Sequence, residues 1–258
     1  MKRVILECKG RLANQILCWA NAVHVLDKLG LEDWVIVVNY PDLASACFPE
    51  GTEVACLAPF DTAKMRRVTR KDLASQNCDC LWVWEDIYSN FPNVATMTRI
   101  IRDIGFPVEW SHRCFNKWVG IHVRFGDYIA IDTANPPVPM PPFPRATEGY
   151  YLNAIAICRE LEPGCRFFVA SDGTDKELSW LTTGRGIIRN VEDDALFDLY
   201  CLSKCRLIIG SASTFTSVAA AYGGVPVVLP SMSPTAIRAI ISKTAHDLRI
   251  STDVSNPS

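Results

Sequence analysis

Along the second half of the chain, short apolar runs alternate with longer segments whose apolar residues recur every three or four positions. The short runs are typical of buried strands, and the longer segments are typical of helices with one buried face. From residue 147 the pattern predicts, in order, helix 148–161, strand 166–170, helix 174–182, strand 186–189, helix 193–204, strand 206–210, helix 214–222, strand 225–229 and helix 234–245. Strands that alternate with helices in this way indicate a parallel, doubly wound α/β sheet.

A shorter version of the same pattern opens the chain. Residues 4–8 and 34–38 are apolar runs that predict strands. Residues 12–29 between them have a helical period, and Gly30 is the expected C-cap. This order of strand, helix and strand is that of a second αβ unit.

The intervening region is less regular. Residues 40–115 consist of short apolar pieces separated by polar ones, and Gly105-Phe106-Pro107 interrupts them. We expect the rest of a smaller αβ domain here. The sequence therefore predicts two domains, residues 1–115 and residues 116–258.

The segment KWVGIHVRFGDY, residues 117–128, combines a buried strand with charged side chains. His122 and Arg124 are two positions apart, so in a strand they point to the same face. Gly126 permits a tight turn, which would leave Asp127 in the loop beyond the strand. The carboxyl end of such a strand is where open α/β sheets bind ligands. Alternatively, Arg124 and Asp127 form a structural ion pair without a ligand.

Other polar turns are expected at the same edge of the sheet, because right-handed crossovers open every strand-to-helix turn on one side. Residues 211–215 are rich in hydroxyls and run into a helix start, where amides can grip an anion. Arg124 could clamp the same phosphate. Asp172 and Asp198 could accept donors from a base edge or a ribose hydroxyl, although Asp172 and Ser213 could equally be helix caps. Together these turns predict a site for a nucleoside diphosphate.

Composition and charge narrow the functional classes. The 258 residues carry a formal net charge of −2, so no global attraction to nucleic acid or acidic membranes is implied. One basic cluster is expected to be a solvated helix face, although it could touch an anionic lipid or polysaccharide. It comprises Lys64, Arg66, Arg67, Arg70 and Lys71.

The cysteines and the apolar runs bear on location. The chain has 11 cysteines, many of them inside apolar runs, and no CxxC pair with zinc spacing. We expect reduced thiols in the cytosol. No run approaches the ~20 apolar residues of a membrane-spanning helix. The sequence therefore predicts a cytoplasmic protein, in contact with a membrane at most peripherally.

Four motifs in chain order resemble those of the fucosyltransferase superfamily, most closely the α-1,2-fucosyltransferases. GIHVRFGDY at residues 120–128 matches the H-x-R-x-x-D motif of that family. GRLANQ at residues 10–15 resembles its Gly-x-x-x-Asn-Gln turn, and FFVASD at residues 167–172 resembles its strand ending in Ser-Asp. DLYCLSKC at residues 198–205, with Ser-Thr-Phe at residues 213–215, is similar to its last motif.

The resemblance implies a GT-B fold, in which two Rossmann-like domains face a cleft. The expected reaction is an inverting transfer of L-fucose from GDP-fucose to a hydroxyl of a glycan, as in polysaccharide biosynthesis. The C-terminal domain would bind the donor, and the N-terminal domain would lie on the acceptor side. No cofactor is expected, and no metal, because the chain has no strict Asp-x-Asp triplet.

The resemblance also assigns roles to residues. His122 and Asp198 would contact guanine or its ribose. Arg124 would hold the β-phosphate together with the turn formed by Ser213, Thr214 and Phe215.

Proton removal from the acceptor is the least defined step. Asp127 is the first candidate for the catalytic base. Alternatively, Asp127 only orients Arg124 and the base is Glu7, or the proton leaves through Asn14 and water. Gly10 and Asn14 stand at the first helix start and are expected at the donor or acceptor, although a purely structural turn is an equal alternative.

Two other interpretations stay open. One is a transferase that uses a different nucleotide sugar, because no residue visibly recognises the methyl group of fucose. The other is a catalytically silent module that binds nucleotides or glycans. A phosphohydrolase has the least support, since the sequence shows neither a metal-ligand cluster nor a nucleophile elbow. The acceptor and the oligomeric state are not defined by the sequence.

Overall fold

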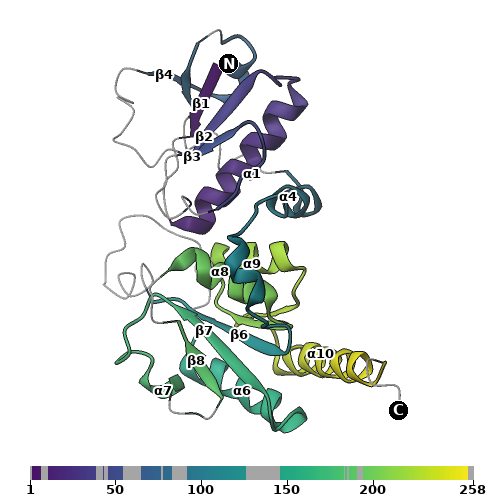
Figure 1. The fold of residues 1–258 in the computed structure, drawn as a ribbon. Helices are drawn as coiled ribbons and strands as arrows, with labels where there is room; N and C mark the ends of the chain where they lie inside the picture. Colours follow the sequence, from purple (N-terminus) through teal and green to yellow (C-terminus); the bar gives the residue numbers. More distant parts are fainter. Residues whose placement is uncertain are drawn as a thin grey trace. The chain divides into compact units, whose positions relative to one another are not determined.

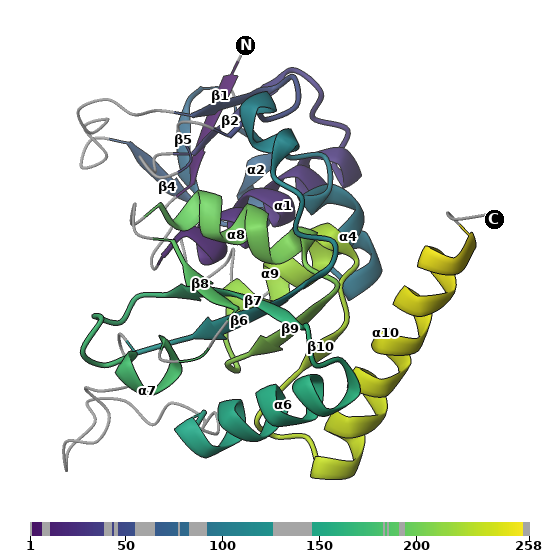
Figure 2. The same cartoon turned by 60° about the horizontal axis from the view of Figure 1, so that its bottom comes forward.

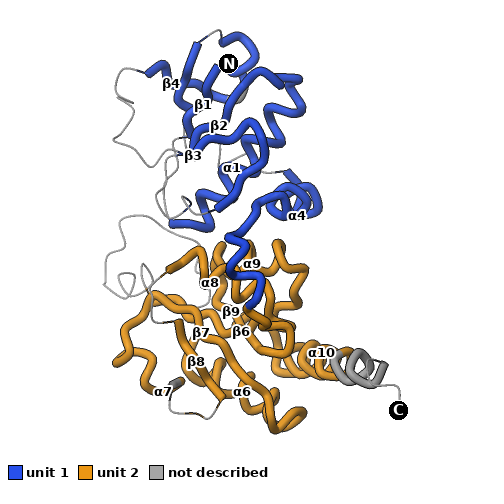
Figure 3. Tube along the Cα trace, in the orientation of Figure 1, with its two compact units in different colours: residues 1–112 blue, residues 113–258 orange. Residues whose placement is uncertain are grey.

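Two α/β units make up the protein (Figure 1, Figure 2). The structure, a computed structural model, describes residues 2–6, 11–38, 43, 46–54, 65–76, 78–82, 92–125, 146–182, 184, 186–190 and 194–254. Unit 1 comprises residues 1–112 and unit 2 residues 113–258 (Figure 3). The sequence placed the division between domains after residue 115.

Unit 1 contains a parallel five-stranded sheet in the order β3-β2-β1-β5-β4. Its strands are β1 (Lys2–Leu6), β2 (Trp34–Val38), β3 (Thr52–Val54), β4 (Arg66–Val68) and β5 (Cys80–Trp82). Its helices are α1 (Leu12–Lys28), α2 (Arg70–Leu73), α4 (Val94–Ile101) and the 3-10 helix η3 (Val108–His112). The sequence predicted only β1, β2 and α1, because strands of three residues are too short to show a period.

The ends of α1 follow from local chemistry. Leu29, in a right-handed conformation, is the C-cap, and Gly30 follows it with φ 63°. Gly30, the expected C-cap, therefore lies one position beyond the observed C-cap, where glycine tolerates the left-handed conformation. The buried face of α1 includes the ring of Trp19, which donates from Nε1 to Thr52 Oγ1 at 3.0 Å. This contact joins the helix to β3.

Unit 2 contains a second parallel sheet, in the order β10-β9-β6-β7-β8. Its strands are β6 (Trp118–Val123), β7 (Arg166–Ser171), β8 (Ile187–Arg189), β9 (Leu207–Gly210) and β10 (Val227–Val228). Its helices are α6 (Glu148–Leu161), α7 (Ser179–Thr182), α8 (Ala195–Lys204), α9 (Thr214–Gly223) and α10 (Pro234–Val254). The predicted doubly wound α/β architecture is confirmed.

Helices cover both faces of this sheet. One face packs against α6, α7 and α10 and forms the main core, and the other carries α8 and α9 (Figure 2). The alternation of β6 separates the two faces. Val119, Ile121 and Val123 belong to the core on the α6 face. Gly120 lies against α8, where an added Cβ would be 2.7 Å from Leu202 Cδ2.

Two helices of unit 2 differ from their predicted lengths. Helix α7 begins only at Ser179, because Thr174 and Glu177 close a turn before it: Thr174 N donates to Glu177 Oε2 at 2.7 Å, and Glu177 N donates to Thr174 Oγ1 at 3.3 Å. Helix α10 continues to Val254, nine residues beyond its expected end at residue 245. Within the described ranges, every helix is too short or too polar to span a bilayer.

The packing of α8 against α9 depends on Gly223. An added Cβ there would lie 1.9 Å from the carbonyl oxygen of Ser203, which belongs to the backbone and cannot turn aside. We expect Gly223→Ala to lower the free energy of unfolding by about 1–3 kcal/mol, the usual cost of overpacking. Urea denaturation of the purified variant measures this loss.

Gly149→Ala is the matched control, because the nearest atom to its added Cβ is Thr147 Oγ1 at 3.9 Å. Alanine in a helix turn is expected to leave stability unchanged or to raise it by up to about 1 kcal/mol. Equal losses in the two variants would contradict the packing argument.

Candidate functional site

The strand order of unit 2 creates a switch point. The chain runs outward from β6 through β7 to β8 and then returns to β9 on the other side of β6. The turns after β6 and β9 therefore lead to helices on opposite faces, and ligands of open α/β sheets bind at the carboxyl ends of such a strand pair. His122 near the end of β6 lies opposite Gly210 at the end of β9.

Gly210 permits a close approach at this point. An added Cβ there would be 2.3 Å from Thr216 Cγ2, so the first turn of α9 folds directly over the end of β9. The same close approach brings the hydroxyl of Thr216 to His122. Sequence reasoning did not single out Thr216, because a threonine inside a helix gives no signal of its own.

His122 is held by hydroxyl groups of the turn after β9. The side chain is buried, with 4% of its surface exposed. Three hydroxyl oxygens lie near its Nδ1 atom, at 2.8 Å (Thr216), 3.1 Å (Ser211) and 3.4 Å (Ser213). The ring of Phe215 packs over the imidazole, with ring centroids 4.8 Å apart. These contacts fix the ring between β6 and the start of α9.

Burial makes His122 a neutral side chain. Loss of solvent lowers its pKa to about 3; Asp172 opposes this shift, and Arg124 adds to it. A neutral imidazole has one N–H donor and one acceptor nitrogen. His122 can therefore hydrogen-bond an uncharged group, but it does not supply a positive charge for a phosphate.

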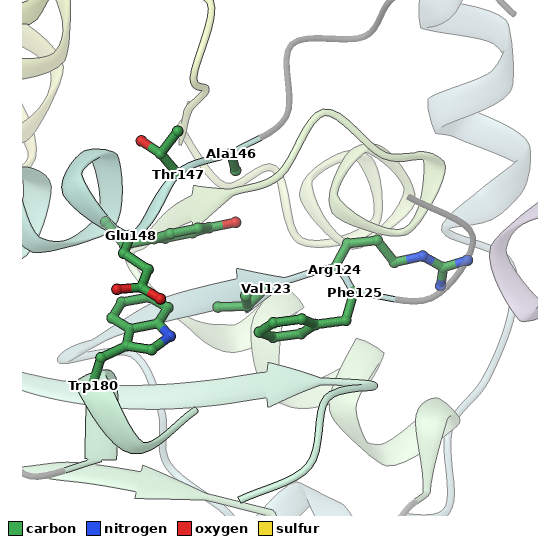
Figure 4. Close-up of a pocket in the computed structure, with 8 residues that line it drawn as sticks. Val123, Arg124, Phe125, Ala146, Thr147, Glu148 and Trp180 are labelled. Atoms are coloured by element: carbon green, nitrogen blue, oxygen red, sulfur yellow. The ribbon is translucent and has the colours of Figure 1, made fainter. Parts of the chain in front are cut away.

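Positive potential comes from Arg124 and from α9. Arg124 Nη1 lies 3.4 Å from Asp172 Oδ2, and both side chains are partly buried. Phe125 N donates to the other oxygen, Oδ1, at 2.8 Å. Asp172 therefore orients Arg124 and fixes the backbone beyond β6. In Figure 4 the guanidinium of Arg124 extends away from Val123 and Phe125.

The start of α9 supplies backbone donors. Ser213 is its N-cap, and its hydroxyl accepts a hydrogen bond from Thr216 N at 3.4 Å. The hydroxyl that the sequence assigned to a ligand thus also caps the helix and contacts His122. Thr214 and Phe215 are the first residues of α9, where amides lack partners within the helix and the helix dipole attracts anions.

The other predicted residues are distributed as follows. Asp198 lies in the first turn of α8, on the face of the sheet that also carries α9. Asn14 lies in the first turn of α1, in unit 1, and its N–H donates to Arg11 O at 2.9 Å. Gly10 and Asp127 lie outside the described residues, as does Glu7. The parts that the structure brings together are therefore those of unit 2.

Two adjacent tyrosines of α6, which the sequence did not indicate, stabilise the same edge. The Tyr151 hydroxyl donates to His122 O at 2.9 Å. The Tyr150 hydroxyl lies 2.8 Å from Val228 O and 3.1 Å from Gly210 O. Burial raises the pKa of both tyrosines, so both hydroxyls stay protonated donors. They hold the carboxyl ends of β6, β9 and β10 in place.

A metal site is a separate question. In the ranges that the structure describes, no three His, Cys, Asp or Glu side chains gather where they could hold a metal ion. The metal independence expected from the sequence stays a prediction.

The burial of His122 predicts a pH dependence of stability. An unfolded histidine has a pKa of about 6.5, whereas the folded group stays neutral to about pH 3. The contribution of neutral His122 to the free energy of unfolding is complete above pH 6.5. It is lost as the pH falls below this value, because only the unfolded state takes up the proton. We expect a loss of about 2 kcal/mol in the free energy of unfolding between pH 7 and pH 5.

Urea unfolding at pH 7, 6 and 5 tests this dependence. His122→Asn should flatten the slope, whereas His246→Asn, at an exposed position of α10, should keep it. A slope that survives in His122→Asn would assign the proton uptake to other groups.

Comparisons with known proteins bear on the fold. No model of a known protein family matches the chain, and no curated protein matches it in sequence. Apo POFUT1 has a similar structure, with 12% identity, coverage of 90% of this chain and 98% of that chain, and a TM-score of 0.60. POFUT1 in complex with GDP-fucose gives 12% identity, the same coverage and a TM-score of 0.55. NodZ alpha-1,6-fucosyltransferase, soaked with GDP-fucose, gives 13% identity, coverage of 91% and 97%, and a TM-score of 0.53. The protein therefore has the two-domain, GT-B-like α/β fold of these fucosyltransferases.

Proposed function

We propose that the protein is a glycosyltransferase that moves L-fucose from GDP-fucose to a hydroxyl group of a glycan. One observation carries the proposal. At the switch point between β6 and β9, an oriented guanidinium and a helix N-terminus stand beside a buried, neutral histidine. A nucleoside diphosphate needs such a division between positive groups for the phosphates and neutral groups for the nucleoside. The fold of fucosyltransferases solved with GDP-fucose supports this choice of nucleotide.

In this proposal the β-phosphate lies between Arg124 and the first amides of α9, at Thr214 and Phe215. Asp172 is a positioning residue, because it fixes Arg124 in the direction of the phosphate. His122, held by the cap residue Ser213 and its neighbours, hydrogen-bonds the guanine or its ribose. Asp198, on the same face of the sheet, accepts donors of the nucleoside.

The geometry suits departure of a diphosphate. Cleavage of the bond to fucose passes through an oxocarbenium-like transition state, while negative charge grows on the leaving β-phosphate. A fixed guanidinium and helix-start amides stabilise this charge without reorganising during the reaction. We therefore infer an inverting, metal-independent transfer. Asp127 is the proposed base, and Glu7, or Asn14 with water, are the alternatives.

The finer assignments rest on the sequence alone. The α-1,2 linkage is proposed from the resemblance of the four sequence motifs to those of α-1,2-fucosyltransferases, whereas NodZ is an α-1,6 enzyme. The cytoplasmic location, a role in polysaccharide biosynthesis, peripheral membrane contact and the contribution of Gly10 stay predictions.

A thermal-shift panel tests the proposed donor. The ligands are GDP, GDP-fucose, GDP-mannose, UDP-glucose and UDP, each with and without a chelator. A ligand that binds only the folded state at 100 times its Kd adds about 2.7 kcal/mol of stability. We expect GDP and GDP-fucose to raise Tm, with no effect of the chelator. Arg124→Ala should abolish the rise.

Arg166→Ala is the matched control. Arg166 lies at the opposite end of the same sheet, where its guanidinium is 4.0 Å from the centroid of the Trp118 ring. This variant should keep the full ligand-induced rise. A larger rise in Tm with UDP compounds, or a rise that requires metal, would contradict the assignment of GDP-fucose as the donor. No change in Tm with any nucleotide would favour the interpretation as a catalytically silent, glycan-binding module.

A further inference from the structure

A small cavity adjoins Arg124 on the α6 face of the sheet, opposite the face that carries α8 and α9 (Figure 4). Its volume is about 220 Å³. The residues that line it are Val123, Arg124, Phe125, Ala146, Thr147, Glu148, Tyr151 and Trp180. None of the functional roles given above uses this cavity.

Three aromatic rings form a fixed apolar wall. Tyr151 is anchored by the hydrogen bond from its hydroxyl to His122 O, and its ring centroid lies 5.8 Å from that of Trp180. Phe125 packs directly on Gly173, where an added Cβ would be 2.4 Å from the ring. The wall is therefore preformed, and it is connected to the backbone of the proposed nucleotide site.

Two polar groups, the indole N–H of Trp180 and the carboxylate of Glu148, belong to residues that line the cavity. The Nε1 of Trp180 is buried and has no acceptor in the described part of the chain, and Figure 4 shows it on the side of the indole that faces Phe125. Glu148, an exposed residue in the first turn of α6, lines the same cavity, and its carboxylate projects toward the Trp180 indole in the view of Figure 4. The cavity thus offers one charged acceptor, the exposed carboxylate of Glu148, beside an aromatic surface, whereas the buried indole N–H is not accessible from it.

Size and chemistry select the ligand class. Pockets for drug-sized molecules have volumes of roughly 300–1,000 Å³, so 220 Å³ suits a single ring and excludes a nucleoside diphosphate. A purely apolar ligand would cover the Glu148 carboxylate without satisfying it, which is costly. A phosphate would meet the negative charge of Glu148. A neutral pyranose ring fits all three constraints, because its C–H face packs on aromatic rings while its hydroxyls donate and accept.

We propose that this cavity binds one neutral sugar ring of the acceptor glycan. The inference rests on the proposed function, which supplies the glycan. Arg124 would then separate two ligands: it lines the sugar cavity, and its guanidinium, paired with Asp172, is available to the diphosphate. Glu148 accepts hydrogen bonds from sugar hydroxyls, and the aromatic wall, which includes the ring of Trp180, packs on the sugar ring.

Saturation-transfer NMR with methyl glycosides of galactose, glucose, N-acetylglucosamine and mannose, with GDP present, tests the cavity. At least one glycoside is expected to bind the wild-type protein. Trp180→Leu should weaken its Kd at least tenfold, and Glu148→Gln about fivefold. Glu109→Gln, the same change at an exposed acid of unit 1, should leave the Kd unchanged.

Thermal shifts separate the two proposals. GDP should raise Tm equally in the wild type, Trp180→Leu and Glu148→Gln, which also establishes that both variants fold. If GDP does not raise the Tm of the wild type, the proposed function is wrong. The glycoside measurements would still show whether the cavity binds a sugar.

Three results would overturn the sugar subsite: no glycoside binds, binding is unchanged in both variants, or Trp180→Leu weakens GDP-fucose but not GDP. The last would assign the cavity to the donor sugar.

Discussion

The parallel pairing of β6 with β9 is the constraint on which the rest of the candidate site depends. It sets His122 opposite Gly210, and only a glycine there allows Thr216 to fold over the strand end. The hydroxyls that surround the imidazole all come from the turn after β9 and the first turn of α9. A shift of one residue in this register would reverse the faces of β6 and turn the imidazole into the aliphatic core on the α6 side.

Different degrees of burial give His122 in β6 and Arg124 just beyond it different charges. His122 is enclosed, so the cost of burying a charge keeps it neutral. Arg124 stays partly exposed and paired with Asp172, so its charge is retained where an anion can approach. The site thereby combines a neutral and a positive hydrogen-bonding side chain at the carboxyl end of β6, and the positive one is paired with Asp172.

Helix α6 links the two sides of β6. The Tyr151 hydroxyl donates a hydrogen bond to the carbonyl oxygen of His122. The ring of Tyr151 lines the cavity, together with Glu148 and Trp180. Because this helix also holds β9 and β10 through Tyr150, the proposed sugar and nucleotide sites share one rigid support. Such a support suits the proposed transfer reaction, in which two substrates must be held in a fixed relation.

The sequence by itself determined the elements with strong local periods, namely the alternating strands and helices of unit 2. It missed β3, β4 and β5, because each of these strands has only three residues and shows no period. It also extended α7 over a turn that is closed by Thr174 and Glu177. Only the tertiary structure decided that Asp172 orients Arg124 and that hydroxyls enclose His122. The physical reason is that these contacts join residues far apart in the chain, so they depend on strand register and packing, which no local pattern encodes.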